Sequence, residues 1–228
     1  MTDFVFPPAP VPTVAVAGSA LRFPVRRVFC VGRNYAEHAR EMGGDDRDPP
    51  FFFTKPADAV VESGATIPFP PLTTNLHHEI ELVVAIGRGG VDISADAALD
   101  HVFGYGVGVD LTRRDLQAAA REQGKPWDWA KGFDNSAPCG AIHRVAEVGH
   151  PAQARIWLSV DGVMRQDSDI AELTWSVPEI IAFASQAVAL KPGDLIYTGT
   201  PAGVGPVLSG QTIAGGIDGL GEIALTLA

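Results

Sequence analysis

The sequence predicts a mostly β protein of the α+β class, with a mixed β-sheet and a few short helices. The apolar segments are short and strand-like, and only two clear helical patterns stand among them, so the chain lacks the strand–helix alternation of a doubly wound sheet. Gly 25 and Pro 18 in 228 residues are a high share, typical of many turns between short strands. We expect a single domain over residues 26–228, after an extended lead-in over residues 1–25.

The N-terminal third is predicted to contain more extended structure than helix. Prolines at positions 7, 8, 10 and 12 exclude a helix from the lead-in. There follow a buried strand over 26–32, a short helix over 34–42 ended by two glycines, a surface loop over 43–50 and a strand over 51–55.

The remaining elements are marked by apolar patterns and by turn residues. We expect a strand over 77–86, a turn or short helix at 96–100, a glycine-rich apolar segment over 102–111 and a helix over 112–123 with Thr112 as N-cap. Asp161 and Gly162 predict a hairpin between strands 156–160 and 163–166. Then come a helix over 177–189 with Pro178 in its first turn and late strands over 194–198 and 223–227.

Composition and charge exclude several classes of protein. The net charge of −10 argues against a protein that binds the nucleic-acid backbone. No apolar run approaches the ~18 residues of a membrane span. The N-terminus lacks a basic region, so we expect neither a secretory signal nor a transit peptide, and we expect a cytoplasmic protein. Cys30 and Cys139 cannot build a disulfide framework or a four-sulfur metal site, and we interpret both as buried apolar residues.

Two glutamates in the segment HHEIELVVAI (77–86) give the strongest indication of a functional site. In a strand, Glu79 and Glu81 point to the same face, about 6.6 Å apart, and His77 shares that face. The strand continues as VVAI, apolar on both faces, which favours burial. Buried paired carboxylates require a cation or a proton between them. The alternative is a solvated outer face of an antiparallel sheet.

A third carboxylate follows the glycine-rich segment GYGVGVD. Its glycines and Asp110 fall on one face, so another group can approach the backbone closely there. The segment is not a dinucleotide-binding motif, because Val109 stands where that motif needs glycine. Asp110 alone could be a loop residue or lie next to a helix N-cap. With Glu79 and Glu81 it completes an all-oxygen set that suits Mg²⁺ or Mn²⁺ better than zinc.

Further candidate functional residues each have a purely structural interpretation as the alternative. His38 and Glu41, three residues apart on the predicted helix 34–42, can touch, so the carboxylate can orient the imidazole as a base; a mixed-charge surface helix is the alternative. Lys131 lies between aromatic residues in WDWAKGFD, where Trp127 and Trp129 could desolvate it or give cation–π contact; it could equally be a surface lysine.

The segment GDLIYTGTPAGVG (193–205) ends a strand in a glycine-rich turn. Its backbone N–H groups and Thr200 could hold a carboxylate. A plain tight turn is the alternative.

Six ordered segments together resemble the fumarylacetoacetate hydrolase superfamily. They are GRNYAEHA, PFFFTKP, HHEIELVVAIG, GYGVGVDLTRRDLQ, WDWAKGFD and LKPGDLIYTGTPAGVG, and the resemblance extends from about residue 26 to the end. The chain is too short for the extra domain of the larger members. It is most similar to the one-domain branch, the acylpyruvases and the bacterial fumarylpyruvate hydrolases of gentisate breakdown. The resemblance implies a mixed β-sheet roll, a single catalytic domain and a homodimer.

The resemblance also implies roles for individual residues. Glu79, Glu81 and Asp110 would bind Mg²⁺ or Mn²⁺, and Lys131 matches the family's lysine. His38 and Glu41 match the His–Glu pair that the one-domain branch carries on a lid. The implied substrate-binding residues are Arg33, Asn34, Arg114, Gln117, Gly199 and Thr200, with Thr200 on the substrate carboxylate.

Two segments depart from the family pattern. The stretch GGDDRDPP (43–50) is acidic, and Gly210-Gln211 stands where the family usually has Gly-Asp. We expect the first to affect substrate choice and the second only local turn stability.

The implied activity is metal-dependent hydrolysis of the C–C bond of a 3-acylpyruvate, first of all 3-fumarylpyruvate to fumarate and pyruvate. Acetylpyruvate hydrolysis, oxaloacetate decarboxylation and diketo-acid isomerisation or hydration are alternatives on the same scaffold, each with a small diketo acid as partner. The His38–Glu41 pair favours hydrolysis, because attack by water needs a base. A non-catalytic binding protein of this family would have lost one of the metal-binding carboxylates or the lysine, and here all four are present. A cupin would need a His-x-His pair, which the sequence lacks.

Overall fold

The computed structural model describes residues 3–35 and 49–228, and its largest sheet is mixed. In this part of the chain the sheet runs in the order β4 (Phe51–Lys55), β3 (Arg27–Gly32), β15 (Asp194–Tyr197), β8 (Ile80–Ile86), β9 (Val102–Val109), β11 (Ala137–Cys139) and β5 (Val60–Glu62), and β12 (His143–Arg144) pairs with β9. The β15–β3 and β11–β5 pairs are parallel and the others are antiparallel, which confirms the predicted mixed sheet.

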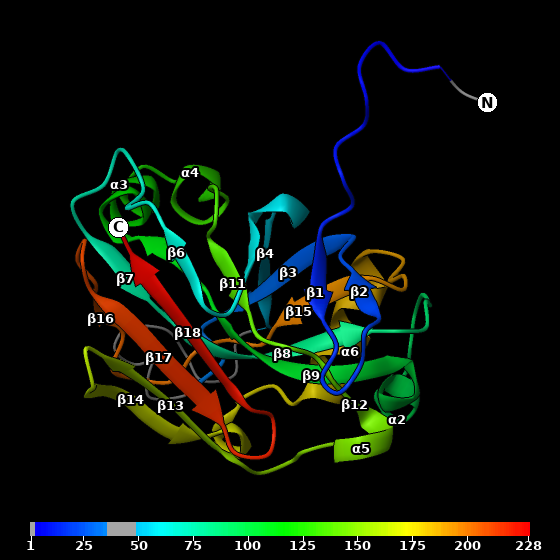
Figure 1. Cartoon of the computed structure of the whole chain (residues 1–228). Coiled ribbons are helices and arrows are strands. Elements are labelled where there is room, and N and C mark those ends of the chain that lie inside the picture. Colours follow the sequence, from blue (N-terminus) through cyan, green and yellow to red (C-terminus); the bar gives the residue numbers. More distant parts are fainter. Residues whose placement is uncertain (1–2, 36–48) are drawn as a thin grey trace.

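Smaller sheets surround this one (Figure 1). One contains β14 (Val163–Asp169), β13 (Arg155–Val160), β17 (Thr212–Ile217), β18 (Glu222–Leu227) and β6 (Ala65–Ile67) in that order. Another contains β10 (Thr112–Arg113), β7 (Leu76–His78) and β16 (Gly205–Pro206). β1 (Thr13–Ala15) and β2 (Arg22–Pro24) form a separate hairpin.

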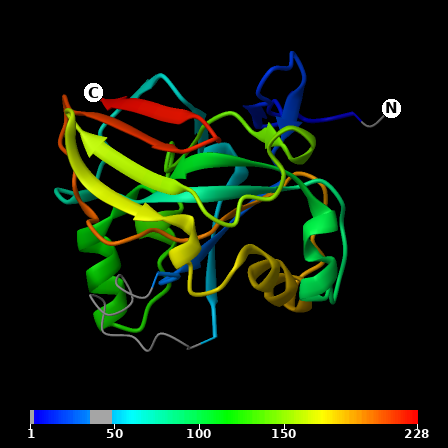
Figure 2. The ribbon, with the colours of Figure 1, turned by 90° about the horizontal axis from the view of Figure 1, so that it is seen from below.

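The helices are short, as predicted, and lie around the sheets. Within the described residues they are α2 (Ala95–Ala98), α3 (Arg114–Glu122), α4 (Asp128–Lys131), α5 (Val145–Val148) and α6 (Val177–Ala187), with 3₁₀ turns η1 (Ala57–Ala59), η2 (Leu99–His101) and η3 (Ile170–Glu172). Figure 2 shows α2 and α6 packed side by side. None of the helices within residues 3–35 and 49–228 has the length and apolar character to span a membrane.

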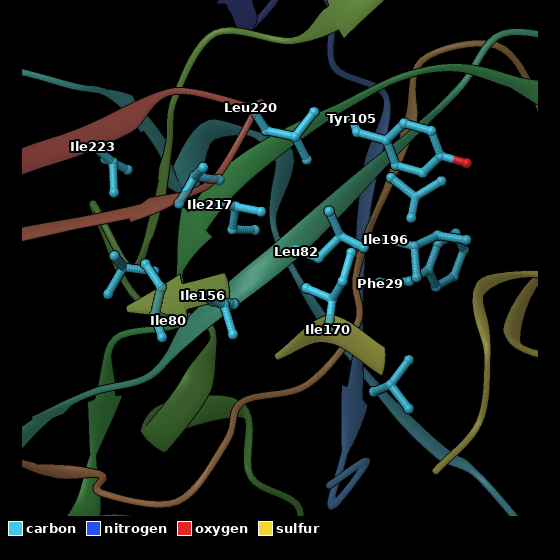
Figure 3. Close-up of a cluster of buried hydrophobic side chains, with 14 of the residues drawn as sticks. Phe29, Ile80, Leu82, Tyr105, Ile156, Ile170, Ile196, Ile217, Leu220 and Ile223 are labelled. Atoms are coloured by element: carbon cyan, nitrogen blue, oxygen red, sulfur yellow. The ribbon is translucent and has the colours of Figure 1, made fainter. Parts of the chain in front are cut away.

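Strand β8 is buried on both faces, as its apolar sequence predicted. Ile80 and Leu82 face a core cluster that includes side chains of the second sheet, such as Ile156 and Ile217 (Figure 3). Val83 faces a second cluster on the opposite side. The start of β8 therefore lies between two apolar clusters, and Glu81 at this position is buried.

Several local predictions are confirmed. Asp161 and Gly162 have φ of 49° and 76°, the left-handed values of the tight hairpin turn between β13 and β14. Helix α6 begins at Val177, and the Glu179 carboxylate accepts hydrogen bonds from the backbone N–H and the hydroxyl of Ser176. Both cysteines are free and buried.

Other predictions were wrong in detail. Within the lead-in, residues 13–24 form the β1–β2 hairpin, which was not predicted, and the segment before it projects from the molecule (Figure 1). The single strand over 77–86 is broken at Glu79 into β7 and β8, which belong to different sheets. Thr112 does not cap α3, which begins at Arg114, because its hydroxyl accepts a hydrogen bond from Lys131.

Of the helix expected over 34–42, the structure describes the first two residues. Asn34 and Tyr35 are not helical, and Tyr35 forms an antiparallel bridge to Leu173. The rest of that segment, and nearly all of the loop expected over 43–50, lies outside the described residues.

A buried carboxylate fastens the end of β15 to β3. Asp194 is fully buried and lies 3.1 Å from Arg26 Nη1 and 2.8 Å from Arg27 Nη2, and it accepts the backbone N–H of Lys191. We expect Asp194→Asn to lower the free energy of unfolding by about 2 kcal/mol, since both arginines lose a charged partner but keep access to water. Urea unfolding checks this value. Asp167→Asn, at an exposed pair with Arg155, should cost much less; an equal loss would contradict the reasoning.

Candidate active site

Antiparallel pairing brings the three predicted carboxylates together. Glu81 of β8 lies opposite Gly108 of β9, so the start of β8 meets the end of β9. Glu79 occupies the break before β8, Asp110 directly follows β9, and the Asp110 N–H donates to the Glu79 carbonyl over 2.8 Å. Each of the three carboxylates is buried and offers an oxygen within 4.8 Å of the other two.

In the described part of the chain, Lys131, Lys55 and Arg114 contact two of these carboxylates. Lys131 Nζ lies 2.8 Å from Glu79 Oε2, 2.7 Å from Asp110 Oδ2 and 2.6 Å from the hydroxyl of Thr112. Burial alone would lower the pKa of Lys131, but Asp110 and Glu79 outweigh it and hold that pKa above its ordinary value. Lys55 Nζ lies 2.8 Å from Asp110 Oδ1, and Arg114 pairs with the other Glu79 oxygen.

Glu81 has a different environment. Its carboxylate accepts the backbone N–H of Gly199 over 2.7 Å, and no Lys or Arg nitrogen of the described chain lies within ion-pair distance. Burial raises the pKa of Glu81 well above its usual range, and the charges of Asp110 and Glu79 raise it further. The site therefore favours a cation beside Glu81. Three hard oxygen donors, with no His or Cys among them, fit Mg²⁺ or Mn²⁺.

A pocket opens above the carboxylates, and its empty space, including the part open to solvent, is about 370 Å³. Its polar lining includes Arg33, Arg114, Gln117, Lys131 and Thr200 together with the three acids. Its apolar side is an aromatic wall formed by Phe51, Phe53 and Trp127, in which the Trp127 ring meets the two phenylalanine rings edge-on at 5.2 and 6.0 Å between centroids.

Four of the six predicted substrate-binding residues line this pocket. Arg33 has a left-handed φ of 57°, and its guanidinium carbon lies 6.0 Å from the centre of the Phe51 ring. Arg114 donates a hydrogen bond to Gln117, and the pair borders Glu79. Thr200, in the glycine-rich turn after β15, is the fourth of these residues. The predicted catalytic pair His38 and Glu41 lies outside the described residues.

Asn34 and Gly199 support the site from behind. The Asn34 amide donates to the carbonyls of Thr198 and Trp175 and accepts the N–H of Trp175, so its hydrogen-bonding groups are committed to backbone. Gly199 directs its N–H to Glu81. Its φ of 100° and a Cβ position 2.7 Å from Asn34 Cβ require glycine.

Two expected contacts differ from the prediction. The ring over Lys131 belongs to Phe53, at 4.9 Å, whereas Trp129 is 76% exposed, because helix α4 turns it outward. His77 does not share the triad's face, since the break at Glu79 places it in β7, next to Asn75 and Arg114 Nε. Burial, helped by the charge of Arg114, lowers the pKa of His77 to about 4, so its ring is a neutral acceptor for that arginine.

The glycine face of β9 is covered by the protein itself. A Cβ at Gly104 would lie 2.2 Å from the carbonyl oxygen of His143, and one at Gly108 would lie 2.5 Å from the Tyr197 ring. The close approach that the glycines predicted is therefore internal packing. It seats Tyr197 behind Glu81, where its hydroxyl donates to the backbone of residues 137 and 138.

Sequence reasoning missed two buried polar residues. Lys55, in the otherwise apolar strand FFFTK, contacts Asp110 and the Leu111 carbonyl. Gln166, on β14, is fully buried and links Thr200 to the segment around Glu79. For Lys55, a lysine at the end of a mostly apolar strand was a usable signal. No signal in the sequence indicated Gln166.

Comparisons with known proteins agree with this geometry. The model of the fumarylacetoacetate (FAA) hydrolase C-terminal family matches residues 27–228. The fumarylpyruvate hydrolase of Ralstonia sp. is 48% identical over 78% of this chain and 92% of its own length. The mitochondrial oxaloacetate tautomerase FAHD1 of Arabidopsis thaliana is 43% identical over 86% of this chain and 88% of its own.

A solved structure extends the similarity over nearly the whole chain. The crystal structure of fumarylpyruvate hydrolase from Pseudomonas aeruginosa in complex with Mn²⁺ and pyruvate is 53% identical, covers 99% of both chains and superposes with a TM-score of 0.96. The fold is the mixed β-sheet roll that the resemblance implied, and the chain is a hydrolase that acts on carbon–carbon bonds. This chain belongs to the fumarylacetoacetate hydrolase family.

Proposed function

We propose that this enzyme hydrolyses 3-acylpyruvates, with 3-fumarylpyruvate as its main substrate and fumarate and pyruvate as products. The observation that carries this proposal is the buried triad of Glu79, Glu81 and Asp110 at the base of a pocket that also presents cationic side chains. Relatives named fumarylpyruvate hydrolase, at 48% and 53% identity, support it.

The pocket supplies the charge that an anionic diketo acid needs. The whole chain carries −10, so its overall field does not attract such a substrate. Arg33, Arg114 and Lys131 provide positive charge locally. Thr200 offers a hydroxyl to the carboxylate next to the keto group. Mg²⁺ or Mn²⁺, held by the triad, would polarise the 2-oxo group and stabilise the negative charge of the departing pyruvate unit.

The remaining chemistry is assigned to side chains. His38, oriented by Glu41, takes a proton from water, and the resulting hydroxide attacks the distal acyl carbonyl. Lys131 stabilises the oxyanion that forms there. The C–C bond then breaks, and its electron pair passes to the pyruvate unit, which takes up a proton. The roles of His38 and Glu41 derive from the family resemblance.

The aromatic wall and Arg33 favour a fumaryl group over an acetyl group. A fumaryl group is flat, conjugated and ends in a carboxylate. Phe51, Phe53 and Trp127 offer ring surfaces to its flat part, and the guanidinium of Arg33 has no carboxylate partner in the described part of the chain. Arg33 can therefore bind the distal carboxylate.

Arg33→Met is expected to raise KM for fumarylpyruvate about 10- to 100-fold, the usual effect of losing a hydrogen bond to a charged group. KM for acetylpyruvate, which has no distal carboxylate, should change little. Steady-state kinetics on both substrates measure the difference. An equal rise for both would contradict this assignment of the distal carboxylate.

Oxaloacetate is a second candidate substrate. The 43% identity to an oxaloacetate tautomerase favours it, and the same triad and cations would bind its keto acid end. Decarboxylation or tautomerisation of oxaloacetate would use the metal site without attack by water. Acetylpyruvate hydrolysis, and isomerisation or hydration of other diketo acids, are further alternatives.

The experiment that tests the proposal follows the ultraviolet absorbance of 3-fumarylpyruvate with purified enzyme, first with Mg²⁺ and then with EDTA. Acetylpyruvate and oxaloacetate are measured in parallel, and the products are identified by chromatography. We expect rapid, metal-dependent formation of fumarate and pyruvate. Turnover of oxaloacetate alone, or activity unaffected by EDTA, would overturn the proposal.

We further propose the homodimer that the resemblance implies, which light scattering on the purified protein would test. A monomer at micromolar concentration would contradict it. Cytoplasmic localisation remains a prediction.

A further inference from the structure

The side-chain amide of Gln166 links the glycine-rich turn on one side of the pocket to the residues around Glu79 on the other. Gln166 is the one fully buried residue of β14, a strand whose other residues are exposed or half-buried. Its Nε2 donates to Thr200 Oγ1 over 2.8 Å and to the Pro201 carbonyl over 2.9 Å. Its Oε1 lies 3.1 Å from the backbone nitrogen of Ile80 and 3.1 Å from His78 Nδ1. The amide thus joins the glycine-rich turn to both neighbours of Glu79.

The orientation of this amide follows from its partners. A carbonyl oxygen can only accept, so the Gln166 nitrogen must face Pro201. A backbone N–H can only donate, so the Gln166 oxygen must face Ile80. The same oxygen accepts from His78, which therefore carries its proton on Nδ1. Both amide hydrogens and both lone pairs are then used.

This orientation determines what Thr200 can do. The Thr200 oxygen accepts a hydrogen bond from Gln166, so its own hydrogen is directed to a different partner. Thr200 lines the pocket beside the triad. Its hydroxyl hydrogen is therefore available to an acceptor in the pocket, and a carboxylate is such an acceptor.

We propose that Gln166 is a positioning residue, which holds the Thr200 hydroxyl as a fixed donor toward the carboxylate of the keto acid. This inference rests on the proposed function. Without Gln166, the hydroxyl would rotate among acceptors, including the Pro201 carbonyl that the amide now occupies, and part of the affinity for the keto acid would be lost.

A double-mutant cycle on pyruvate binding tests this coupling. Calorimetry measures the Kd of pyruvate for the Mn²⁺-loaded wild type, Gln166→Met, Thr200→Val and the double variant. We expect about 10-fold weaker binding for Gln166→Met and about 10- to 100-fold weaker binding for Thr200→Val. The double variant should bind no more weakly than Thr200→Val, because Gln166 acts only through that hydroxyl. In kinetics, Gln166→Met should raise KM more than it lowers kcat.

The cycle separates this inference from its alternatives. Gln211→Met is the matched control, since the Gln211 side chain also makes two hydrogen bonds, next to the sheet that contains β14, but is not among the described residues that line the pocket. The Kd of this variant should equal that of the wild type. If Gln166→Met weakened pyruvate binding by the same factor in the wild type and in the Thr200→Val background, the inference would be overturned. An unchanged Kd in Gln166→Met would overturn it as well. A wild type that binds no pyruvate would instead contradict the proposed function.

Neutron diffraction of the deuterated wild type tests the same point if Gln166→Met fails to fold. We expect the Gln166 deuterons to face Thr200 Oγ1 and the Pro201 carbonyl, with the Thr200 deuteron directed into the pocket. A Thr200 deuteron directed at Gln166 would overturn the inference.

Discussion

Glu81→Gln is expected to lower the turnover of 3-fumarylpyruvate about 1,000-fold or more and to weaken Mn²⁺ binding by more than about 100-fold. Glutamine keeps the shape of the side chain, and its oxygen can still accept the Gly199 N–H. The substitution therefore removes a charge and leaves the local fold in place. It also removes the one carboxylate of the triad that has no cationic neighbour in the described chain.

Metal titration and kinetics on the same preparation measure both effects. Glu147→Gln is the matched control, because Glu147 makes an exposed pair with Arg144 far from the pocket, and its kinetics should equal those of the wild type. Full metal-dependent activity in Glu81→Gln would show that the triad is not the metal site.

Lys131→Met is expected to lower kcat about 100- to 1,000-fold, the usual effect of removing one donor to a developing oxyanion. Affinity for Mn²⁺ should be equal to or higher than that of the wild type, because the variant loses an ammonium that competes for Glu79 and Asp110. Lys131→Arg should not restore kcat, since a planar guanidinium cannot replace an ammonium that meets three partners in a buried site.

Single-turnover kinetics and metal titration together distinguish these effects. Lys191→Met, at an exposed lysine, serves as the control for the loss of a surface charge. If Lys131→Met lost Mn²⁺ affinity in proportion to its loss of kcat, Lys131 would act by supporting the metal site, and its assignment to the oxyanion would be wrong.

The carboxylate triad was predictable because its signal is local. Strand alternation predicted that Glu79 and Glu81 lie together, and the apolar residues after them indicated burial. The break at Glu79 changes the strand but keeps the two carboxylates close. The mixed sheet was predictable for a similar reason, since short apolar segments without regular helices favour it. Asp110 could be added because it falls on the same face as the glycines before it and completes an all-oxygen set with the two glutamates.

The supporting residues could not be predicted in the same way. Lys55 and Gln166 reach the site through contacts between strands far apart in the sequence, and alternation within one strand carries no information about such pairing. The glycine pattern was visible, but the group that fills the space, Tyr197, depends on the order of strands in the sheet. The break at Glu79 also escaped prediction, because residues on both sides of it have strand-like sequences.

The most direct test of the metal site is anomalous diffraction at the manganese edge from crystals grown with Mn²⁺ and pyruvate. We expect one strong peak within bonding distance of Glu79, Glu81 and Asp110, with pyruvate beside it and Thr200 in contact with its carboxylate. A peak elsewhere, or no peak in crystals of enzyme that turns over fumarylpyruvate, would contradict the assignment of the triad as the catalytic metal site.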